Sequence, residues 1–185
     1  MQTINHGAHL DVPFKEYLSW DAVSKHDLDL VARSPAHYRA AKMTPQETTP
    51  AMAFGTAAHA WILEPEKAAE QVAVAPKVDR RTKAGKEQWA EFEMMHPNKV
   101  HINDEDARHL AAMHAAVRNH KVAAKLLDDR TATEVSVLWG DERTGVQCRC
   151  RPDLVSGNVI VDLKTTFDAS KAAFSHTMHK YRYQV

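Results

Sequence analysis

The spacing of hydrophobic residues changes near residue 130, and this change divides the chain into two parts. Before that point, apolar residues recur with the period of helices that bury one face. After it, hydrophobic and polar residues alternate, as they do in strands with one buried face. The pattern therefore predicts a mainly helical part over residues 1–130 and a β-rich part over residues 131–185.

Start and stop signals place the helices of the first part. Ser24 and Asn103 are good N-caps, and Pro35 suits the first position of a helix. The stretch "RRTKAGKEQWAEFEMM" is expected to begin as a basic loop and to become helical near Lys86. The other expected helices cover residues 24–33, 34–42, 51–64, 103–120 and 121–128.

The second part reads as three strands joined by turns. Alternation covers residues 132–139, 146–155 and 158–166, and "GDERTG" and "SGN" lie between them as turns. Neighbouring strands with short turns predict an antiparallel meander, and Asp168 is expected to cap a final helix. The expected fold class is α/β (α+β), in one domain over residues 1–185, with a helical N-terminal half before the meander.

The third strand carries charges that strands usually avoid. Asp162 and Lys164 fall on one face, and Asp153 lies across the turn on the neighbouring strand. Two nearby carboxylates repel each other unless a cation or a proton lies between them. Carboxylate oxygens suit Mg²⁺, and a lysine beside the ion can orient or deprotonate an attacking water. This set predicts phosphodiester hydrolysis, while an ordinary Asp–Lys ion pair on a surface strand remains open.

Charge and composition limit the possible partners and location. The chain has 185 residues, with 24 basic and 24 acidic side chains, so its formal net charge is zero. A nucleic-acid partner would then be held by a local basic patch. No apolar run approaches the ~18 residues of a membrane span. The two cysteines, Cys148 and Cys150, are too close in sequence to favour a disulfide, which predicts a reduced, cytoplasmic protein.

Several stretches of the chain resemble a known nuclease family. "RPDLV…VIVDLKTT" is similar to the P-D-x(n)-(D/E)-x-K motif of the restriction-endonuclease-like superfamily. More narrowly, "SKHDLDLVARSPAHYRA", "FGTAAHAWILEPE", "RRTKAGKEQW", "GVQCRCRPDL", "VDLKTTFDAS" and "YRYQV" resemble the RecE (exonuclease VIII) type of phage and prophage exonuclease. The resemblance extends over about residues 20–185 and implies a restriction-endonuclease-like core.

This resemblance also implies an activity and its partners. Such an enzyme uses Mg²⁺, with Mn²⁺ able to substitute, and degrades one strand of duplex DNA from its 5′ end. The 3′ overhang that it leaves serves a single-strand-annealing recombinase of the RecT type. Enzymes of this type assemble as homo-oligomeric rings around DNA, and no membrane is involved.

The resemblance assigns roles to individual residues. Asp153 and Asp162 are the expected metal carboxylates, and Lys164 is the catalytic lysine. The Leu163 carbonyl and His59 are further expected ligands, although a helical histidine is usually an ordinary packed residue. Two more catalytic-site residues are expected at the edge of the site and near DNA, with exposed surface positions as their alternative: Glu134 and Gln184.

Basic residues supply candidate DNA contacts. Four of them cluster in one short segment and could grip phosphates without reading sequence: Arg80, Arg81, Lys83 and Lys86. A solvated basic loop is the alternative. Arg149 and Arg151 alternate on the face of Asp153, where they could contact the scissile strand or balance the acids.

Two functions of different classes remain open at this point. One is the 5′→3′ exonuclease, and the other is a non-catalytic nuclease-fold module that binds DNA ends or a recombinase. The intact Asp153, Asp162 and Lys164 favour the enzyme. Because the family's final helix usually continues beyond the glutamine, the chain is expected to be a fragment or a natural truncation. We expect it to be incomplete at the C-terminus, which favours the binding module.

Overall fold

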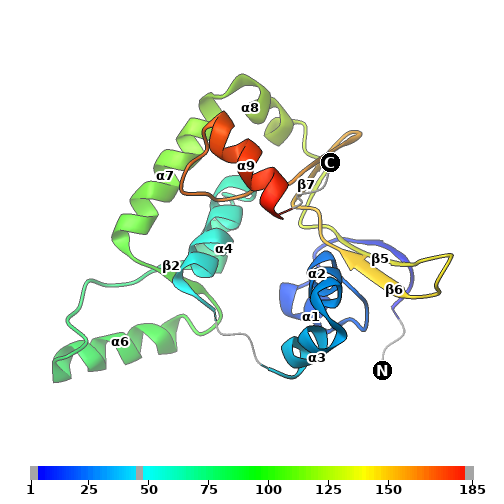
Figure 1. Cartoon of the computed structure of the whole chain (residues 1–185). Helices are drawn as coiled ribbons and strands as arrows, with labels where there is room; N and C mark the ends of the chain where they lie inside the picture. The colour runs from blue at the N-terminus through cyan, green and yellow to red at the C-terminus, as the bar shows by residue number, and fades with distance from the viewer. Residues whose placement is uncertain (1–3, 45–47, 182–185) are drawn as a thin grey trace.

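The computed structural model describes residues 4–44 and 48–181, and it is a mixed α/β structure (Figure 1). This agrees with the fold class predicted from the sequence. Its helices are α1 (Phe14–Ser19), α2 (Lys25–Arg33), α3 (Pro35–Met43), α4 (Pro50–Leu63), α5 (Ala68–Gln71), α6 (Lys83–Met95), α7 (Asp104–Asn119), α8 (Lys121–Asp128) and α9 (Lys171–Tyr181). Its strands are β1 (Gly7–His9), β2 (Val72–Val74), β3 (Val100–Ile102), β4 (Ala132–Thr133), β5 (Ser136–Gly140), β6 (Gln147–Cys150), β7 (Leu154–Ser156) and β8 (Val159–Val161).

Most helix boundaries follow the caps that the sequence indicates. Ser24 caps α2 in a reciprocal box with Asp27, and the Asn103 side chain accepts from Asp106 N–H at the start of α7. The expected start of α6 was wrong. The Thr82 hydroxyl accepts from Gly85 N–H, so the helix begins at Lys83 and includes half of the basic segment.

The last helix also begins later than predicted. Asp168 accepts a hydrogen bond from Ser170 N–H, and the Ser170 hydroxyl accepts from Ala173 N–H. Ser170 therefore has the capping role that the sequence assigned to Asp168, and α9 starts at Lys171.

The predicted antiparallel strands form, but they are divided between two sheets. One sheet has the order β1-β5-β6 and the other has the order β4-β7-β8, both antiparallel. The expected strand over 132–139 is interrupted at residues 134–135, which separate β4 from β5. The expected strand over 146–155 is likewise interrupted at residues 151–153, between β6 and β7.

The two interruptions lie side by side. Glu134 N–H donates to the Asp153 carbonyl at 2.9 Å, and Val135 N–H donates to the Pro152 carbonyl at 3.2 Å. The two stretches of backbone therefore stay paired while both pass from one sheet to the other. Glu134 has φ 49°, in the left-handed region that non-glycine residues rarely adopt, and this allows the change of direction.

A second, short β pair was not predicted. β2 and β3 run parallel, and they lie near α4 and α5 rather than in the meander. Each has three residues, which is too short for alternation to be recognised in the sequence. The third strand of the meander also ends early, because β8 stops at Val161 and leaves Asp162 and Lys164 beyond it.

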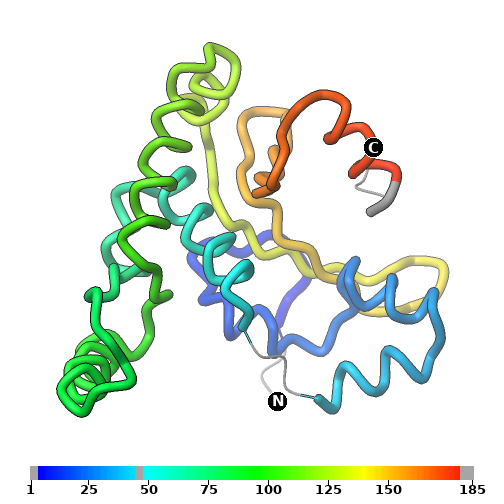
Figure 2. The backbone as a smooth tube through the Cα atoms, turned by 60° about the vertical axis from the view of Figure 1, so that its left-hand side comes forward, coloured from blue at the N-terminus to red at the C-terminus, as the bar shows by residue number. Residues whose placement is uncertain are grey.

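Two hydrophobic cores lie on either side of the interrupted strands. The larger one joins α4, α7, α8 and β7 around Leu63, Leu110 and Leu154, whose side chains are fully buried. The smaller one packs Tyr17 and Trp20 against Leu138 of β5. Figures 1 and 2 show the N-terminal helices beside the β5–β6 hairpin and α4 beside α7. Among the described residues, no helix has the length and apolar character that crossing a membrane requires.

Asp27 joins α2 to α3 and provides a test of this packing. Burial alone would raise the pKa of the carboxyl, but hydrogen bonds from Ser24 and Lys42 outweigh it and lower the pKa below 3.8. The ionised carboxylate therefore contributes stability that is fully present above pH 3.8 and is lost as the pH falls through the folded-state pKa.

We predict that Asp27→Asn lowers the free energy of unfolding by about 1–3 kcal/mol at pH 7, because a charged hydrogen-bond acceptor is lost. The difference from wild type should narrow in acid, and urea unfolding at a series of pH values measures it. Asp29→Asn is the matched control, since Asp29 is an exposed partner of Lys25 on the same helix. A difference that widens in acid would contradict the prediction.

Candidate active site

The paired interruptions of the strands bring two acids together. Glu134 lies between β4 and β5, and Asp153 immediately precedes β7. The main-chain hydrogen bond between them holds their Cα positions side by side. The Asp153 residue is 6% exposed, while the Glu134 side chain is 26% exposed. Both carboxylates are therefore removed from most of the solvent that would stabilise their charge.

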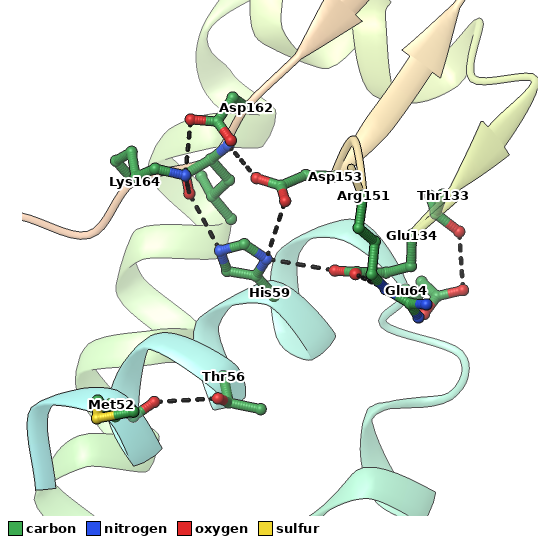
Figure 3. A network of polar contacts seen from close by, with 11 residues as sticks. Met52, Thr56, His59, Glu64, Thr133, Glu134, Arg151, Asp153, Asp162 and Lys164 are labelled. Atoms are coloured by element: carbon green, nitrogen blue, oxygen red, sulfur yellow. Dashed lines mark hydrogen bonds and ion pairs between the residues drawn. The ribbon is translucent and has the colours of Figure 1, made fainter. Parts of the chain in front are cut away.

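His59 enters this site from α4. Its neighbours Ala57, Ala58 and Ala60 are buried, so the backbone of α4 packs closely and His59 is directed towards the strands (Figure 3). His59 Nδ1 lies 3.3 Å from Glu134 Oε1 and 3.6 Å from Asp153 Oδ1. His59 Nε2 lies 3.0 Å from the Leu163 carbonyl oxygen. Both ring nitrogens face acceptors, and the imidazolium form of His59 satisfies both of them. A metal bound to a ring nitrogen would take the place of its proton.

The segment after β8 closes the other side of the site. Leu163 N–H donates to Asp153 Oδ2 at 2.6 Å. Lys164 Nζ pairs with Asp162 at 2.6 Å and lies 3.4 Å from the Leu163 carbonyl oxygen. The alternation expected from the sequence therefore holds beyond the end of the strand. Asp162 and Lys164 share a side (Figure 3), and the Leu163 side chain packs against the larger core.

The electrostatics favour a cation among these acids. Burial raises the pKa of Asp153, despite the opposing effect of His59 and of Leu163 N–H. Burial would lower the pKa of His59, but its hydrogen bond with Glu134 and the charge of Asp153 raise it. Burial would raise the pKa of Glu134, but hydrogen bonds with His59 and Arg151 lower it. The ionised Glu134 and the imidazolium thus stabilise each other.

These side chains also have the donors that a divalent metal needs. His59, Glu134 and Asp153 each offer one ligand atom, and these atoms lie within 4.8 Å of one another. One imidazole nitrogen with carboxylate oxygens suits Mn²⁺ and Mg²⁺, with the nitrogen favouring the softer Mn²⁺. The Leu163 carbonyl, already in contact with His59, is a further oxygen at the same place. The donor set therefore fits a divalent metal.

The structure brings together four of the predicted site residues: His59, Glu134, Asp153 and Leu163. It does not place the Asp162 carboxylate in this cluster. The Asp162 side chain is 57% exposed and pairs with Lys164 instead. Gln184 lies outside the described residues.

The basic segment lies away from this cluster. Arg80 stacks over the Trp89 ring at 4.2 Å, Arg81 pairs with Asp79, and Lys83 lies 3.9 Å from Glu87. Figures 1 and 2 show α6 at the periphery of the molecule, on the opposite side from β7 and α9. The expectation of a single basic loop was wrong, because Lys83 and Lys86 are on α6.

The structure assigns internal partners to the two arginines of the predicted DNA face. Arg149 is 5% exposed, and its guanidinium donates to the Tyr17 and Trp20 carbonyls. It is therefore buried away from any DNA. Arg151 donates from Nε to Glu134 Oε2 at 2.9 Å, so it balances an acid of the site. That balancing role was the alternative left open by the sequence.

The sequence pattern did not indicate a hydrogen bond that fixes the strand next to Glu134. The Thr133 hydroxyl donates to Glu64 Oε1 at 2.8 Å, which ties β4 to the end of α4 directly beside Glu134. Glu64 is 8% exposed and also accepts from Lys67. The motif "HAWILE" places Glu64 five positions after His59, but only the fold reveals that it meets Thr133.

Comparison with known proteins identifies a family for this chain. Residues 24–185 match the model of a family described as a PDDEXK-like domain of unknown function (DUF3799). The chain belongs to this family. No curated protein matches the chain. Membership of the DUF3799 family confirms the PD-(D/E)xK superfamily and indicates a nuclease-type function, while the RecE-like type stays a prediction. Nucleases with this motif generally use divalent metals, in agreement with the cluster of His59 and the two acids.

The chemistry of the donors predicts a difference between metals. His59→Ala should weaken binding of Mn²⁺ more than binding of Mg²⁺, because imidazole nitrogen prefers the softer ion. Isothermal titration of the DNA-free protein with each metal measures this. His109→Ala on α7 is the control and should change neither affinity. Equal losses for both metals would assign His59 a structural role.

Proposed function

We propose that this chain is a divalent-metal-dependent exodeoxyribonuclease. It degrades linear double-stranded DNA from the 5′ end and leaves 3′ overhangs for single-strand annealing. The observation that supports this most strongly is the convergence of His59, Glu134 and Asp153, with Lys164 held beside them through the Leu163 carbonyl. The nuclease-type family gives the class of reaction, and the arrangement of the side chains supplies its parts.

The side chains divide the work of phosphodiester hydrolysis. His59, Glu134, Asp153 and the Leu163 carbonyl would hold Mg²⁺ or Mn²⁺, and Asp162 would be a further ligand if it were released from its pair with Lys164. The metal, when bound, lowers the pKa of a water and neutralises charge that develops on the phosphate. Lys164 orients the attacking water beside the scissile phosphate. The water gives up a proton to solvent as its oxygen bonds to phosphorus, the P–O bond to the leaving nucleotide breaks, and the leaving oxygen takes up a proton from solvent.

The direction of digestion and the partners rest on the resemblance to RecE-type exonucleases. The stretches that carry it include "FGTAAHAWILEPE" and "VDLKTTFDAS", which contain His59 and Lys164. By this likeness the substrate is a duplex DNA end, and the product is handed to a recombinase of the RecT type. A homo-oligomeric ring around DNA belongs to the same proposal.

One observation favours a second function, a non-catalytic module that binds DNA ends or a recombinase. The Asp162 and Lys164 side chains pair at 2.6 Å, so two expected catalytic groups neutralise each other in this arrangement. Catalysis requires this pair to separate, whereas binding does not. Incubating 5′-labelled linear duplex with the protein, in Mg²⁺ and in EDTA, distinguishes the two functions.

We predict that Asp153→Asn, Asp162→Asn and Lys164→Ala each reduce Mg²⁺-dependent digestion of this duplex by about a hundredfold or more, because the two carboxylates hold the metal and Lys164 orients the attacking water. Asp153→Asn should leave the free energy of unfolding unchanged or raise it at pH 7, since burial disfavours the Asp153 charge.

Glu142→Gln is the matched control for these variants, because Glu142 is an exposed acid in the turn between β5 and β6. It should digest the duplex as the wild type does. Digestion at the wild-type rate by any of the three active-site variants would remove that residue from the proposed mechanism. Loss of digestion together with loss of the folded state would instead assign the residue a structural role.

The basic segment should bind phosphates without sequence preference. Replacing Arg80, Arg81, Lys83 and Lys86 by Gln should weaken binding equally for all duplex sequences. The slope of log affinity against log salt should become shallower by roughly 0.9 for each phosphate that the variant no longer neutralises. Binding measured in EDTA over a range of salt concentrations tests this, with Arg108→Gln on α7 as the control. An unchanged slope would show that the segment is only solvated.

A further inference from the structure

We propose that Arg151 is a positioning residue that holds Glu134 in the metal-binding cluster, and that residues 4–23 hold Arg151 in place. We call residues 4–23 the N-terminal brace. This inference rests on the proposed function, because it gives Glu134 a part in binding the metal. Of the two roles that the sequence left open for Arg151, it rejects the contact with DNA and extends the balancing of the acids. It also makes the brace necessary for the geometry of the site.

The contact between Arg151 and Glu134 divides the carboxylate between two partners. Arg151 Nε donates to Glu134 Oε2 at 2.9 Å, while Glu134 Oε1 faces His59 Nδ1 at 3.3 Å. One oxygen is therefore fixed by the arginine and the other is presented to the cluster. Arginine suits this role because its planar guanidinium stays charged and its N–H groups point in fixed directions.

Glu134 needs such support because its backbone is strained. At φ 49°, Glu134 lies in the left-handed region, where the Cβ of a non-glycine residue comes too close to the following carbonyl oxygen. Nothing in the side chain of a glutamate offsets this locally, whereas Asn or Asp could bond to its own backbone. The partners that keep Glu134 in place are the Asp153 carbonyl on its N–H, and Arg151 and His59 on its carboxylate.

Arg151 is in turn held mainly by the N-terminal brace. Its Nη1 donates to the Val12 carbonyl at 3.0 Å and to the Ser136 hydroxyl. Its guanidinium carbon lies 5.8 Å from the centre of the Phe14 ring and 5.6 Å from that of Tyr17. These contacts fix the plane of the guanidinium and therefore the direction of Nε.

The brace is itself anchored to the sheet that carries Arg151. β1 pairs with β5, and Arg149, two positions before Arg151, donates to the Tyr17 and Trp20 carbonyls. The brace precedes the residues matched by the family model, which begin at position 24. A segment outside the family match thus completes the surroundings of a residue in the site.

The same contacts leave Arg151 little capacity to bind DNA. Its side chain is 13% exposed, and its Nε and Nη1 already have partners on the protein. A phosphate contact would require Arg151 to release Glu134 or the brace. A positioning role and a DNA-contact role therefore predict different results when Arg151 is changed.

The test compares metal binding with DNA binding in Arg151→Gln. We expect the Mn²⁺ dissociation constant of the DNA-free protein to rise about tenfold, the effect usual for a group that orients a metal ligand. Affinity for a linear duplex in EDTA, and its salt slope, should stay at the wild-type values. In Mn²⁺, kcat should fall while KM for the duplex stays constant. Arg143→Gln, in the exposed β5–β6 turn, is the matched control and should change none of these.

Two further variants connect the effect to Glu134 and to the brace. On a Glu134→Gln background, Arg151→Gln should weaken Mn²⁺ binding no further, because the pair acts as one unit. Phe14→Ala should weaken Mn²⁺ binding by about twofold, because it removes the ring that lies against the guanidinium. Leu18→Ala, an exposed residue on the same helix without a ring near Arg151, should have no effect.

Opposite results would overturn the inference. Weaker DNA binding in EDTA with a shallower salt slope, and unchanged Mn²⁺ affinity, would make Arg151 a DNA contact. Additive losses of Mn²⁺ affinity in the Arg151–Glu134 double variant would show that the two residues act independently. If Arg151→Gln lowers the thermal midpoint below the assay temperature, Arg151→Lys and Phe14→Ala decide the question, and unchanged Mn²⁺ affinity in both overturns it. Reduced Mn²⁺ affinity in these variants, with a wild-type protein that digests no DNA, would retain the inference and reject the proposed exonuclease.

Discussion

The pairing of the two interrupted strands is the constraint on which the site depends. Two main-chain hydrogen bonds keep two stretches of the chain together at the point where both change sheets. They run from Glu134 N–H to the Asp153 carbonyl and from Val135 N–H to the Pro152 carbonyl. Without these bonds, the backbone groups exposed by the interruptions would lack partners in a buried place. The same bonds bring two carboxylates side by side. Their charges repel each other, and the positive groups around them offset this repulsion.

The groups that stabilise the two carboxylates come from three different elements of the fold. His59 comes from α4, Arg151 from the end of β6, and Leu163 N–H from the segment after β8. Each meets a different carboxylate oxygen, so removing one leaves a particular oxygen without its partner. An ionised carboxylate that is buried without a partner lowers the stability of the fold far more than one exposed to solvent. The site is therefore organised before any ligand binds, which lowers the cost of assembling it around a metal.

Much of the fold could be predicted because its signals are local. Ser24 and Asn103 mark their helices through hydrogen bonds to residues three positions away, and the spacing of Asp162 and Lys164 fixes their common side. The interruption at Glu134 could not be predicted, because no glycine or proline marks it and its cause is the pairing with residues 152–153. Arg149 and Arg151 alternate with Asp153 in the sequence, but their partners in the brace are more than a hundred positions away.

The position of the site between two hydrophobic cores has a consequence for how the chain unfolds. The strands that carry Glu134 and Asp153 pass from the core around Leu138 to the core around Leu154. Disrupting either core withdraws the pairing that both interruptions need, so the two cores should melt together in one cooperative transition. A metal ion bound between the two cores would then stabilise the whole chain, because a ligand that binds only the native state shifts the folding equilibrium by mass action. Nuclease chemistry and global cooperativity would thus depend on the same few hydrogen bonds.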